Sequence, residues 1–225
     1  MENRKFKGAL FDLDGTLADN YSAIHKCTCE AFAQLGIPAP SYDTVLHTVG
    51  GSILITMQRL LEGTPRAADA ARAAEIYLEI YDNFALYGLK AMPYAAEILR
   101  ALRSSGMRLG CFTNKQQSGA ETVLKHLGLF EYFDCVAATS LHSPRKPDPE
   151  FTRSALQLIG LGAGDVVCVG DSPYDYRAAT SCDVPVALVA TGGDSHGRLL
   201  EVCPKALGIF ADLRELSEDV FGVSI

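Results

Sequence analysis

The chain has 225 residues, a formal net charge of −7 and 48% hydrophobic residues. These values are typical of a globular protein that buries a sizeable core in one large or two small domains. Lys and Arg form no long block, so we expect neither a nucleic-acid partner nor a membrane partner. A small anionic substrate stays compatible with this charge, because a bound cation can reverse the local field.

The apolar runs are only several residues long, well short of the roughly 20 that cross a bilayer. No apolar signal-peptide segment follows the charged residues Met1–Lys7, so we expect a cytoplasmic protein. The seven cysteines include no CxxC pair and indicate neither a zinc site nor a disulfide framework. Cys111 and Cys168 fall inside apolar runs, where we expect buried thiols.

Strand-length apolar runs alternate with helical patterns along most of the chain. We predict strands at Phe6–Phe11, Met107–Phe112, Cys135–Ala138, Val166–Val169, Pro185–Val189 and Ala206–Phe210. We predict helices at Pro93–Ser105, Gln116–Leu127, Pro149–Ile159, Pro173–Thr180 and Asp212–Phe221. This alternation predicts an α/β fold, a Rossmann-like doubly wound parallel sheet with helices on both faces.

The segment from about Leu17 to Gly88 breaks this alternation, because it contains no convincing strand. It predicts helices at Tyr21–Leu35, Tyr42–His47, Ser52–Glu62 and Pro65–Phe84. Linkers near Leu17–Asn20 and Tyr87–Met92 would be its hinges. We therefore expect a core domain of residues 1–17 and 90–225, with a small helical domain of residues 18–89 inserted after the first strand.

Polar residues follow three of the predicted strands at the point where each strand ends. The carboxyl ends of parallel strands gather along one edge of such a sheet, where ligands bind. Lys146 lies in a Pro-rich loop that we expect at the same edge. The set is Asp12, Asp14, Thr113, Asn114, Lys146, Asp171 and Asp175.

Several carboxylates without histidine partners suit a hard cation with oxygen ligands, and Mg²⁺ is the usual choice for phosphate chemistry. Together with Lys146, Mg²⁺ would neutralise phosphoryl oxygens. Asp12 could then attack phosphorus and form an aspartyl-phosphate. Asp14 could protonate the leaving oxygen and then activate water.

Each residue also has a plain structural interpretation. Asp12 and Asp14 could form a turn with Gly15, Thr113 or Asn114 could cap the next helix, and Lys146 could be a solvated lysine. Asp171 or Ser172 could be an N-cap with Pro173 at the first helical position, and Asp148 could be one before Pro149. These interpretations do not explain why all the features occur in this order at strand ends.

The motifs resemble those of the haloacid dehalogenase superfamily of phosphatases, over essentially the whole chain. Residues 12–17 match DxDGT, Thr113-Asn114-Lys115 the Ser/Thr motif, residues 146–149 the KPxP lysine motif and residues 170–175 GDSxxD. The helical insert resembles the cap of the phosphoglycolate phosphatase-like branch. Such a cap closes over the site and selects the substrate.

The resemblance implies a role for each matched residue. Asp12 would be the nucleophile and a Mg²⁺ ligand, and Asp14 the acid/base and a ligand through its backbone carbonyl. Thr113 and the Asn114 backbone would hold phosphate, and Lys146 would orient the nucleophile and neutralise charge. Asp171 would bind Mg²⁺, with Asp175 supporting it directly or through water.

We therefore expect a Mg²⁺-dependent phosphohydrolase of a small phosphorylated metabolite, phosphoglycolate among the candidates, and by default a monomer. Asp14 argues against haloacid dehalogenases and phosphonoacetaldehyde hydrolases, which lack this acid. A β-phosphoglucomutase-like mutase stays open, although His25 lies one residue from the register of the mutase cap histidine. A non-catalytic module is the third hypothesis.

The helical insert offers two further candidates. Gly50-Gly51-Ser52 could be a substrate loop or a plain helix start, and Arg59 could be an anion-binding arginine or a solvated one.

Overall fold

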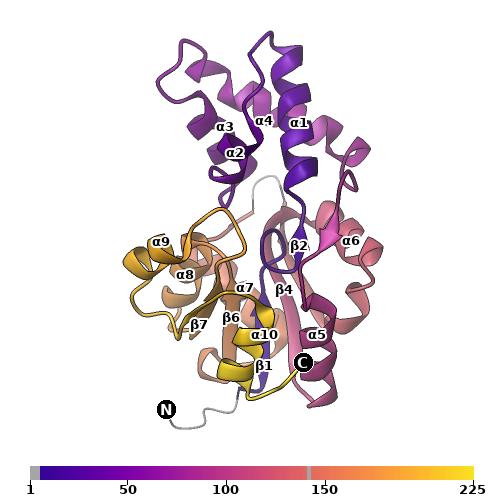
Figure 1. Ribbon diagram of the computed structural model, residues 1–225, viewed down its shortest axis with the longest axis vertical. Helices are drawn as coiled ribbons and strands as arrows, with labels where there is room; N and C mark the ends of the chain where they lie inside the picture. Colours follow the sequence, from indigo (N-terminus) through magenta and orange to yellow (C-terminus); the bar gives the residue numbers. More distant parts are fainter. Residues whose placement is uncertain (1–5, 141–142) are drawn as a thin grey trace.

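The computed structural model describes residues 6–140 and 143–225 (Figure 1). The first five residues of the predicted core segment 1–17 lie outside the described residues. Six parallel strands form one sheet in the order β5-β4-β1-β6-β7-β8. The strands are β1 Gly8–Phe11, β4 Arg108–Gln116, β5 Cys135–Thr139, β6 Val166–Gly170, β7 Val186–Val189 and β8 Ile209–Phe210. The predicted α/β fold class is therefore confirmed.

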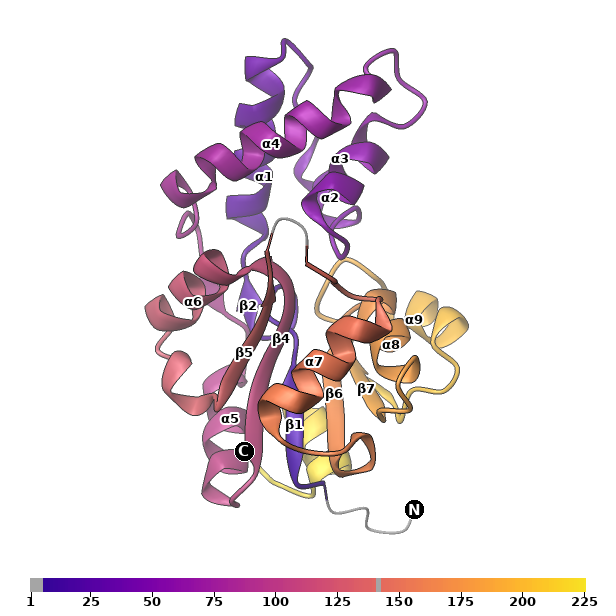
Figure 2. The same cartoon turned by 180° about the vertical axis from the view of Figure 1, so that it is seen from behind.

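Helices cover both faces of the sheet, because successive strand residues point to opposite faces and both sets are apolar. In β1, Ala9 and Phe11 pack in one cluster with α5, α6 and α10, whereas Leu10 packs in another with α7, α8 and α9. Figures 1 and 2 show these two helical layers from opposite sides. The helices are α5 Ala95–Ser104, α6 Gln117–His126, α7 Pro149–Ile159, α8 Pro173–Thr180, α9 His196–Val202 and α10 Leu213–Leu216.

The segment between β1 and α5 forms a separate group of helices above the carboxyl edge of the sheet (Figure 1). It has its own apolar cluster, which includes Phe32, Met57 and Tyr77. The single helix predicted over Pro65–Phe84 is wrong at both ends, where 3₁₀ turns replace it at Ala67–Asp69 and Tyr81–Asn83; such turns are common at helix termini. The helices are α1 Tyr21–Gln34, α2 Tyr42–Leu46, α3 Ile53–Leu61 and α4 Ala70–Ile80.

The two chain crossings between these helices and the sheet lie side by side. β2 (Ala18–Asp19) and β3 (Lys90–Ala91) pair antiparallel within the two predicted linkers. The expectation of no strand between Leu17 and Gly88 is therefore wrong at Ala18–Asp19. Two residues are too few to show the alternation by which a strand is recognised in a sequence.

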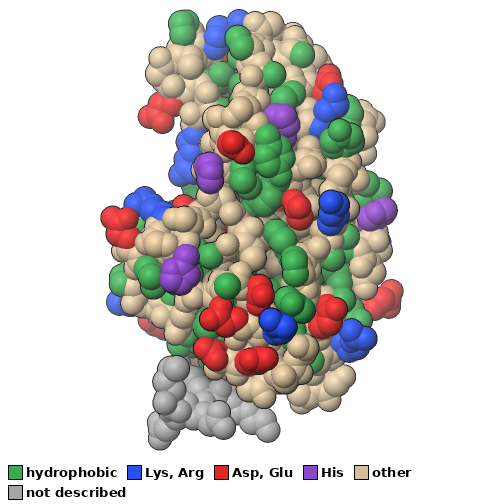
Figure 3. Space-filling view, in the orientation of Figure 1, with side chains coloured by type: hydrophobic (Ala, Val, Ile, Leu, Met, Phe, Trp, Pro, Cys, Tyr) green, Lys and Arg blue, Asp and Glu red, His purple; other side chains and the backbone are tan. Residues whose placement is uncertain are grey.

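The buried thiols predicted at Cys111 and Cys168 are confirmed. No helix among the described residues has both the length and the apolar character needed to span a membrane. On the face drawn in Figure 3, acidic and basic side chains are interspersed, and the outline narrows between the helical group and the sheet domain.

Candidate active site

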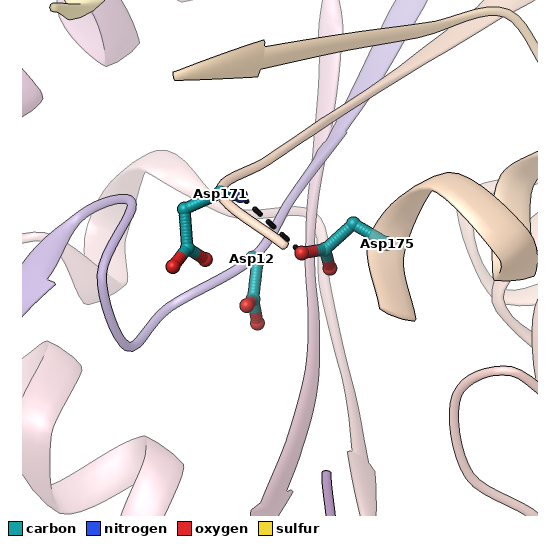
Figure 4. Close-up of side chains that lie close together, drawn as sticks. All are labelled: Asp12, Asp171 and Asp175. Atoms are coloured by element: carbon teal, nitrogen blue, oxygen red, sulfur yellow. Dashed lines mark hydrogen bonds between the residues drawn. The ribbon is translucent and has the colours of Figure 1, made fainter. Parts of the chain in front are cut away.

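The strand ends that sequence analysis singled out are neighbours, because β1 lies between β4 and β6. Asp12 directly follows β1, and its amide donates to the Val169 carbonyl at 2.8 Å. Asp171 directly follows β6, and Asp175 lies in the first turn of α8. One oxygen of each of these three carboxylates lies within 4.8 Å of the others, and Figure 4 shows them grouped around one space.

Two glycines leave room for the Asp171 carboxylate. A Cβ on Gly192 would lie 1.6 Å from Asp171 Oδ2, and one on Gly15 would lie 2.4 Å from the same atom. Gly15 also has a φ of 87°, in the left-handed region that other residues rarely adopt. Backbone therefore approaches the carboxylate from two loops, which fixes its position.

Lys146 joins two of these three carboxylates. Its Nζ lies 2.8 Å from Asp12 Oδ1 and 2.6 Å from Asp175 Oδ1, and it donates to the Phe112 carbonyl at 2.8 Å. The side chain is only 2% exposed, so the interpretation of a solvated lysine is wrong. Burial opposes its charge, but Asp12 and Asp175 outweigh burial and raise the pKa of Lys146.

Asp175 ties this cluster to the start of α8. Its Oδ2 accepts hydrogen bonds from Ser172 Oγ at 2.6 Å, from the Ser172 amide at 3.0 Å and from the Asp171 amide at 3.3 Å. Ser172 and Asp175 thereby form a capping box, with Pro173 at the first helical position. The cap interpretation of Ser172 is confirmed, and the same cap braces the loop that carries Asp171.

The cluster carries more negative than positive charge in a buried space. Burial raises the pKa of Asp12 to about 7, with Lys146 opposing and Asp175 adding to the shift. Burial and Asp175 raise the pKa of Asp171 well above its ordinary value. Lys146 is the one ammonium that contacts Asp12 and Asp175 within the described residues. Three buried carboxylates that share one ammonium fit a hard divalent cation such as Mg²⁺.

Asp14 lies on the cavity side of this cluster and has partners that sequence analysis missed. Lys115 Nζ donates to its two oxygens at 3.0 and 3.3 Å, and Asn20 Nδ2 donates to Oδ1 at 3.1 Å. Asn20 Nδ2 also reaches the Tyr81 hydroxyl at 3.2 Å. The one sequence signal was that Lys115 directly follows Thr113 and Asn114 in their motif.

Thr113 and Asn114 are not helix caps, because α6 begins later, with Gln116 as its N-cap residue. Thr113 is buried, and its Oγ1 accepts from the Lys115 amide at 3.1 Å. The side-chain amide of Asn114 makes two hydrogen bonds to the backbone of Lys146. Asn114 Oδ1 accepts from the Lys146 N–H at 2.7 Å, and Asn114 Nδ2 donates to the Lys146 carbonyl at 3.1 Å. The cap interpretation of Asp148 is confirmed, since it caps α7 ahead of Pro149.

A cavity of about 430 Å³ lies between the carboxyl edge of the sheet and the helical group. Six of the seven predicted site residues line it, and Asp175 lies beneath them. Its far wall is largely apolar. From the core, the lining includes Asp12, Asp14, Thr113, Asn114, Lys115, Arg145, Lys146 and Asp171, and the far wall includes Ile24, Ile53, Leu54, Tyr77 and Leu78.

The helical group touches the core beside this cavity. Arg59 donates to the Tyr174 hydroxyl at 2.8 Å and is not among the lining residues. Its prediction as an anion-binding residue is thus at odds with its position, because its guanidinium is engaged by Tyr174. Gly50, Gly51 and Ser52 do line the cavity. His25 lies elsewhere, against the Pro40 carbonyl and the Tyr42 ring.

The fold and the site together define an α/β protein whose ligand site lies at the carboxyl edge of a parallel sheet beneath a helical insert. The family model of haloacid dehalogenase-like hydrolases matches residues 9–189. The chain belongs to this family, which confirms the resemblance seen in its motifs.

Individual proteins agree with this assignment. The chain is 36% identical over 202 residues to a plasmid-encoded phosphoglycolate phosphatase of Cupriavidus necator, covering 88% of this chain and 85% of the relative. It is 31% identical over 220 residues to the phosphoglycolate phosphatase of Rhodospirillum rubrum, covering 94% and 90%. A solved structure from Lactobacillus delbrueckii has a TM-score of 0.87 at 22% identity, covering 97% of this chain and all of that one, and so shares the fold.

Proposed function

We propose that the chain is a Mg²⁺-dependent phosphatase of a small phosphorylated metabolite, similar to its phosphoglycolate phosphatase relatives. The observation that carries the proposal is the placement of Asp12, Asp14 and Lys146 around one cavity. A nucleophile, an acid/base and a cation are what phosphoryl transfer through a covalent intermediate requires.

Asp12 attacks phosphorus with one carboxylate oxygen, which forms an aspartyl-phosphate as the ester oxygen leaves. Asp14 donates a proton to that oxygen and then takes one from the water that hydrolyses the intermediate. Lys146, held by Asp175, orients Asp12 and offsets phosphoryl charge. Thr113 and the backbone of Asn114 bind phosphoryl oxygens.

Mg²⁺ would be held by Asp12, Asp171 and the Asp14 carbonyl, with Asp175 in support directly or through water. When bound, it supplies positive charge against the phosphoryl oxygens. The close grouping of the buried carboxylates of Asp12, Asp171 and Asp175 and the raised pKa of Asp12 and Asp171 support this assignment.

We further propose that residues 18–89 act as a cap domain over a core of residues 1–17 and 90–225. The separate apolar cluster of the helical group and the paired linkers support this division. Lids of this kind exclude water and select substrates. A phosphosugar mutase is less well supported, since His25 does not line the cavity.

The test compares the purified protein with Asp12→Asn, using p-nitrophenyl phosphate and Mg²⁺. The variant is expected to lose at least about 1,000-fold in kcat, because its amide cannot form the acyl phosphate intermediate. Asp43→Asn on the exposed helix α2 serves as the matched control and keeps its activity. Full turnover by Asp12→Asn would show that the nucleophile assignment is wrong.

A further inference from the structure

Lys115 is a buried cation that the proposed reaction does not use. Its side chain is 7% exposed, yet it belongs to the wall of the cavity. Its ammonium lies 4.7 Å from the centre of the Tyr81 ring, which supports it from the side of the helical group. An ammonium has three N–H donors, and that of Lys115 donates to both carboxylate oxygens of Asp14.

The other charges around the cavity make this position distinctive. Lys146 is engaged by Asp12, Asp175 and the Phe112 carbonyl. Arg145 is a further basic residue of the cavity lining, next to Lys146 in the chain. Within residues 6–140 and 143–225, the wall formed by the helical group carries Glu75 and Asp82 and no Lys or Arg. An anionic group on the substrate would therefore be repelled by that wall and attracted to the Lys115 side.

The geometry of the ester fixes where such an anion lies. The ester oxygen must lie within hydrogen-bond distance of Asp14 if Asp14 is to protonate it. In a phosphate ester whose carboxylate is attached to the ester carbon, two bonds separate that oxygen from the carboxylate carbon. The carboxylate then lies close to Asp14. Lys115 Nζ lies in the same place, 3.0 Å from Asp14 Oδ2.

We propose that Lys115 is a specificity residue that binds a carboxylate on the leaving group and so selects short 2-phosphoacids of the phosphoglycolate type. This inference rests on the proposed function, because it uses Asp14 as the proton donor. Tyr81 and Asn20 hold the pair in place, so that the lysine recognises the substrate next to the bond that breaks.

The experiment measures kcat/KM for 2-phosphoglycolate and for 2-hydroxyethyl phosphate, in which a neutral hydroxymethyl group replaces the carboxylate. The ratio of the two values is the preference for the carboxylate. Lys115→Met is expected to lower this ratio roughly 30- to 100-fold, the range for losing a charge-assisted hydrogen bond. A fall of less than 10-fold overturns the inference, whatever happens to the overall rate.

Three further variants and the wild-type enzyme complete the design. Lys115→Arg keeps the cation and should keep most of the preference, whereas Lys125→Met, on the exposed side of α6, should leave it unchanged. If Arg145→Met rather than Lys115→Met abolishes the preference, the assignment to Lys115 is wrong. If Lys115→Met does not fold, wild type alone decides, since a ratio below 10 overturns the inference.

Failure of the proposed function gives a different result. In that case Asp12→Asn would still hydrolyse both esters. If Asp12→Asn is inactive and the preference does not depend on Lys115, only the inference about Lys115 fails.

Discussion

Arg59, in the helical group, donates a 2.8 Å hydrogen bond to the hydroxyl of Tyr174, in the loop and helix start that carry Asp171 and Asp175. The ring of Tyr174 also lies 5.6 Å from the Arg59 guanidinium and 4.8 Å from that of Arg177. The helical group is thus connected to the core through a residue beside the acidic cluster. A change in the position of the helical group relative to the core would therefore affect the loop that positions the carboxylates.

A double-mutant cycle of Arg59→Met and Tyr174→Phe tests this connection. The phenylalanine keeps the ring and removes only the hydroxyl. We expect a coupling of about 0.5–1 kcal/mol in the free energy of unfolding, typical of a partly exposed hydrogen bond to a charged group. Urea unfolding of the four proteins measures it. Purely additive losses would mean that the contact does not contribute.

Most of the fold follows from local sequence signals, and the exceptions have physical reasons. The predicted bounds of α7 and α8 agree with the structure because Asp148-Pro149 and Ser172-Pro173 mark their starts. Helix α9 was missed, since seven residues at His196–Val202 are too few to establish a helical period. The β2–β3 ribbon was missed because only its pairing partner, over 70 residues away, makes it a strand.

The site was predicted only in part, for a related reason. Strand ends can be located along the sequence to within a few residues, so Asp12, Thr113 and Asp171 could be assigned to one edge, although β4 continues to Gln116. The partners of Asp14 could not, because Lys115 is 101 positions away and the Tyr81 contact depends on how the helices fold back. Lys146 considered alone would have been interpreted as a surface lysine, because the residues next to it in the sequence do not indicate that it is buried.

The stability of the metal-free protein should depend on pH through Asp12. Its pKa is about 7 in the folded protein and near its ordinary value of 3.8 when unfolded. Between these values the folded state holds the extra proton, so the free energy of unfolding falls as pH rises from about 4 to about 7. The contribution of one group is at most about 1.4 kcal/mol per pH unit.

Asp12→Asn removes this titration. In EDTA, the free energy of unfolding of Asp12→Asn minus that of wild type should therefore increase as the pH rises from 4.5 to 7. Asp43→Asn, on the surface, should follow the wild-type curve. Denaturant unfolding at several pH values measures both differences. A difference between Asp12→Asn and wild type that is the same at every pH would contradict the raised pKa.

Magnesium should stabilise the folded protein independently of any turnover. Ligand at 100 times its Kd contributes about 2.7 kcal/mol, which corresponds to a rise of roughly 5–10 °C in Tm for a chain of this size. Asp171→Asn should lose most of this shift, because the cluster loses a carboxylate. Differential scanning fluorimetry in EDTA and in excess Mg²⁺ measures it. An equal shift in Tm for Asp171→Asn would show that the cation binds at another site.

Replacing Lys146 should lower the free energy of unfolding, because the buried carboxylates lose the charge that compensates them. In Lys146→Met, Asp12 and Asp175 lose their shared cation, which lies 2.8 and 2.6 Å away. Removing one partner of a buried ion pair costs about 3–5 kcal/mol. The loss should be smaller near pH 5, where Asp12, whose pKa is raised to about 7, can take up a proton, and Mg²⁺ should restore part of it. Lys125→Met is the matched control, and a loss below about 1 kcal/mol at pH 8 would argue against the role of Lys146.

The hold of Asn114 on Lys146 offers the finest test of positioning. Two hydrogen bonds, of 2.7 and 3.1 Å, join the side chain of Asn114 to the backbone of Lys146. Asn114→Ala removes both, so the loop can shift the ammonium away from Asp12, and misplacement of this kind costs about 10- to 100-fold in kcat.

Asn114→Asp keeps the acceptor for the Lys146 amide but places a carboxylate oxygen against its carbonyl, so it should lie between alanine and wild type. Because Asn114 also contributes its backbone to phosphate binding in our proposal, and neither substitution removes that backbone, KM should change much less than kcat. Steady-state kinetics with p-nitrophenyl phosphate separate the two effects. A rise in KM at unchanged kcat would mean that the side chain acts on the substrate and not on Lys146.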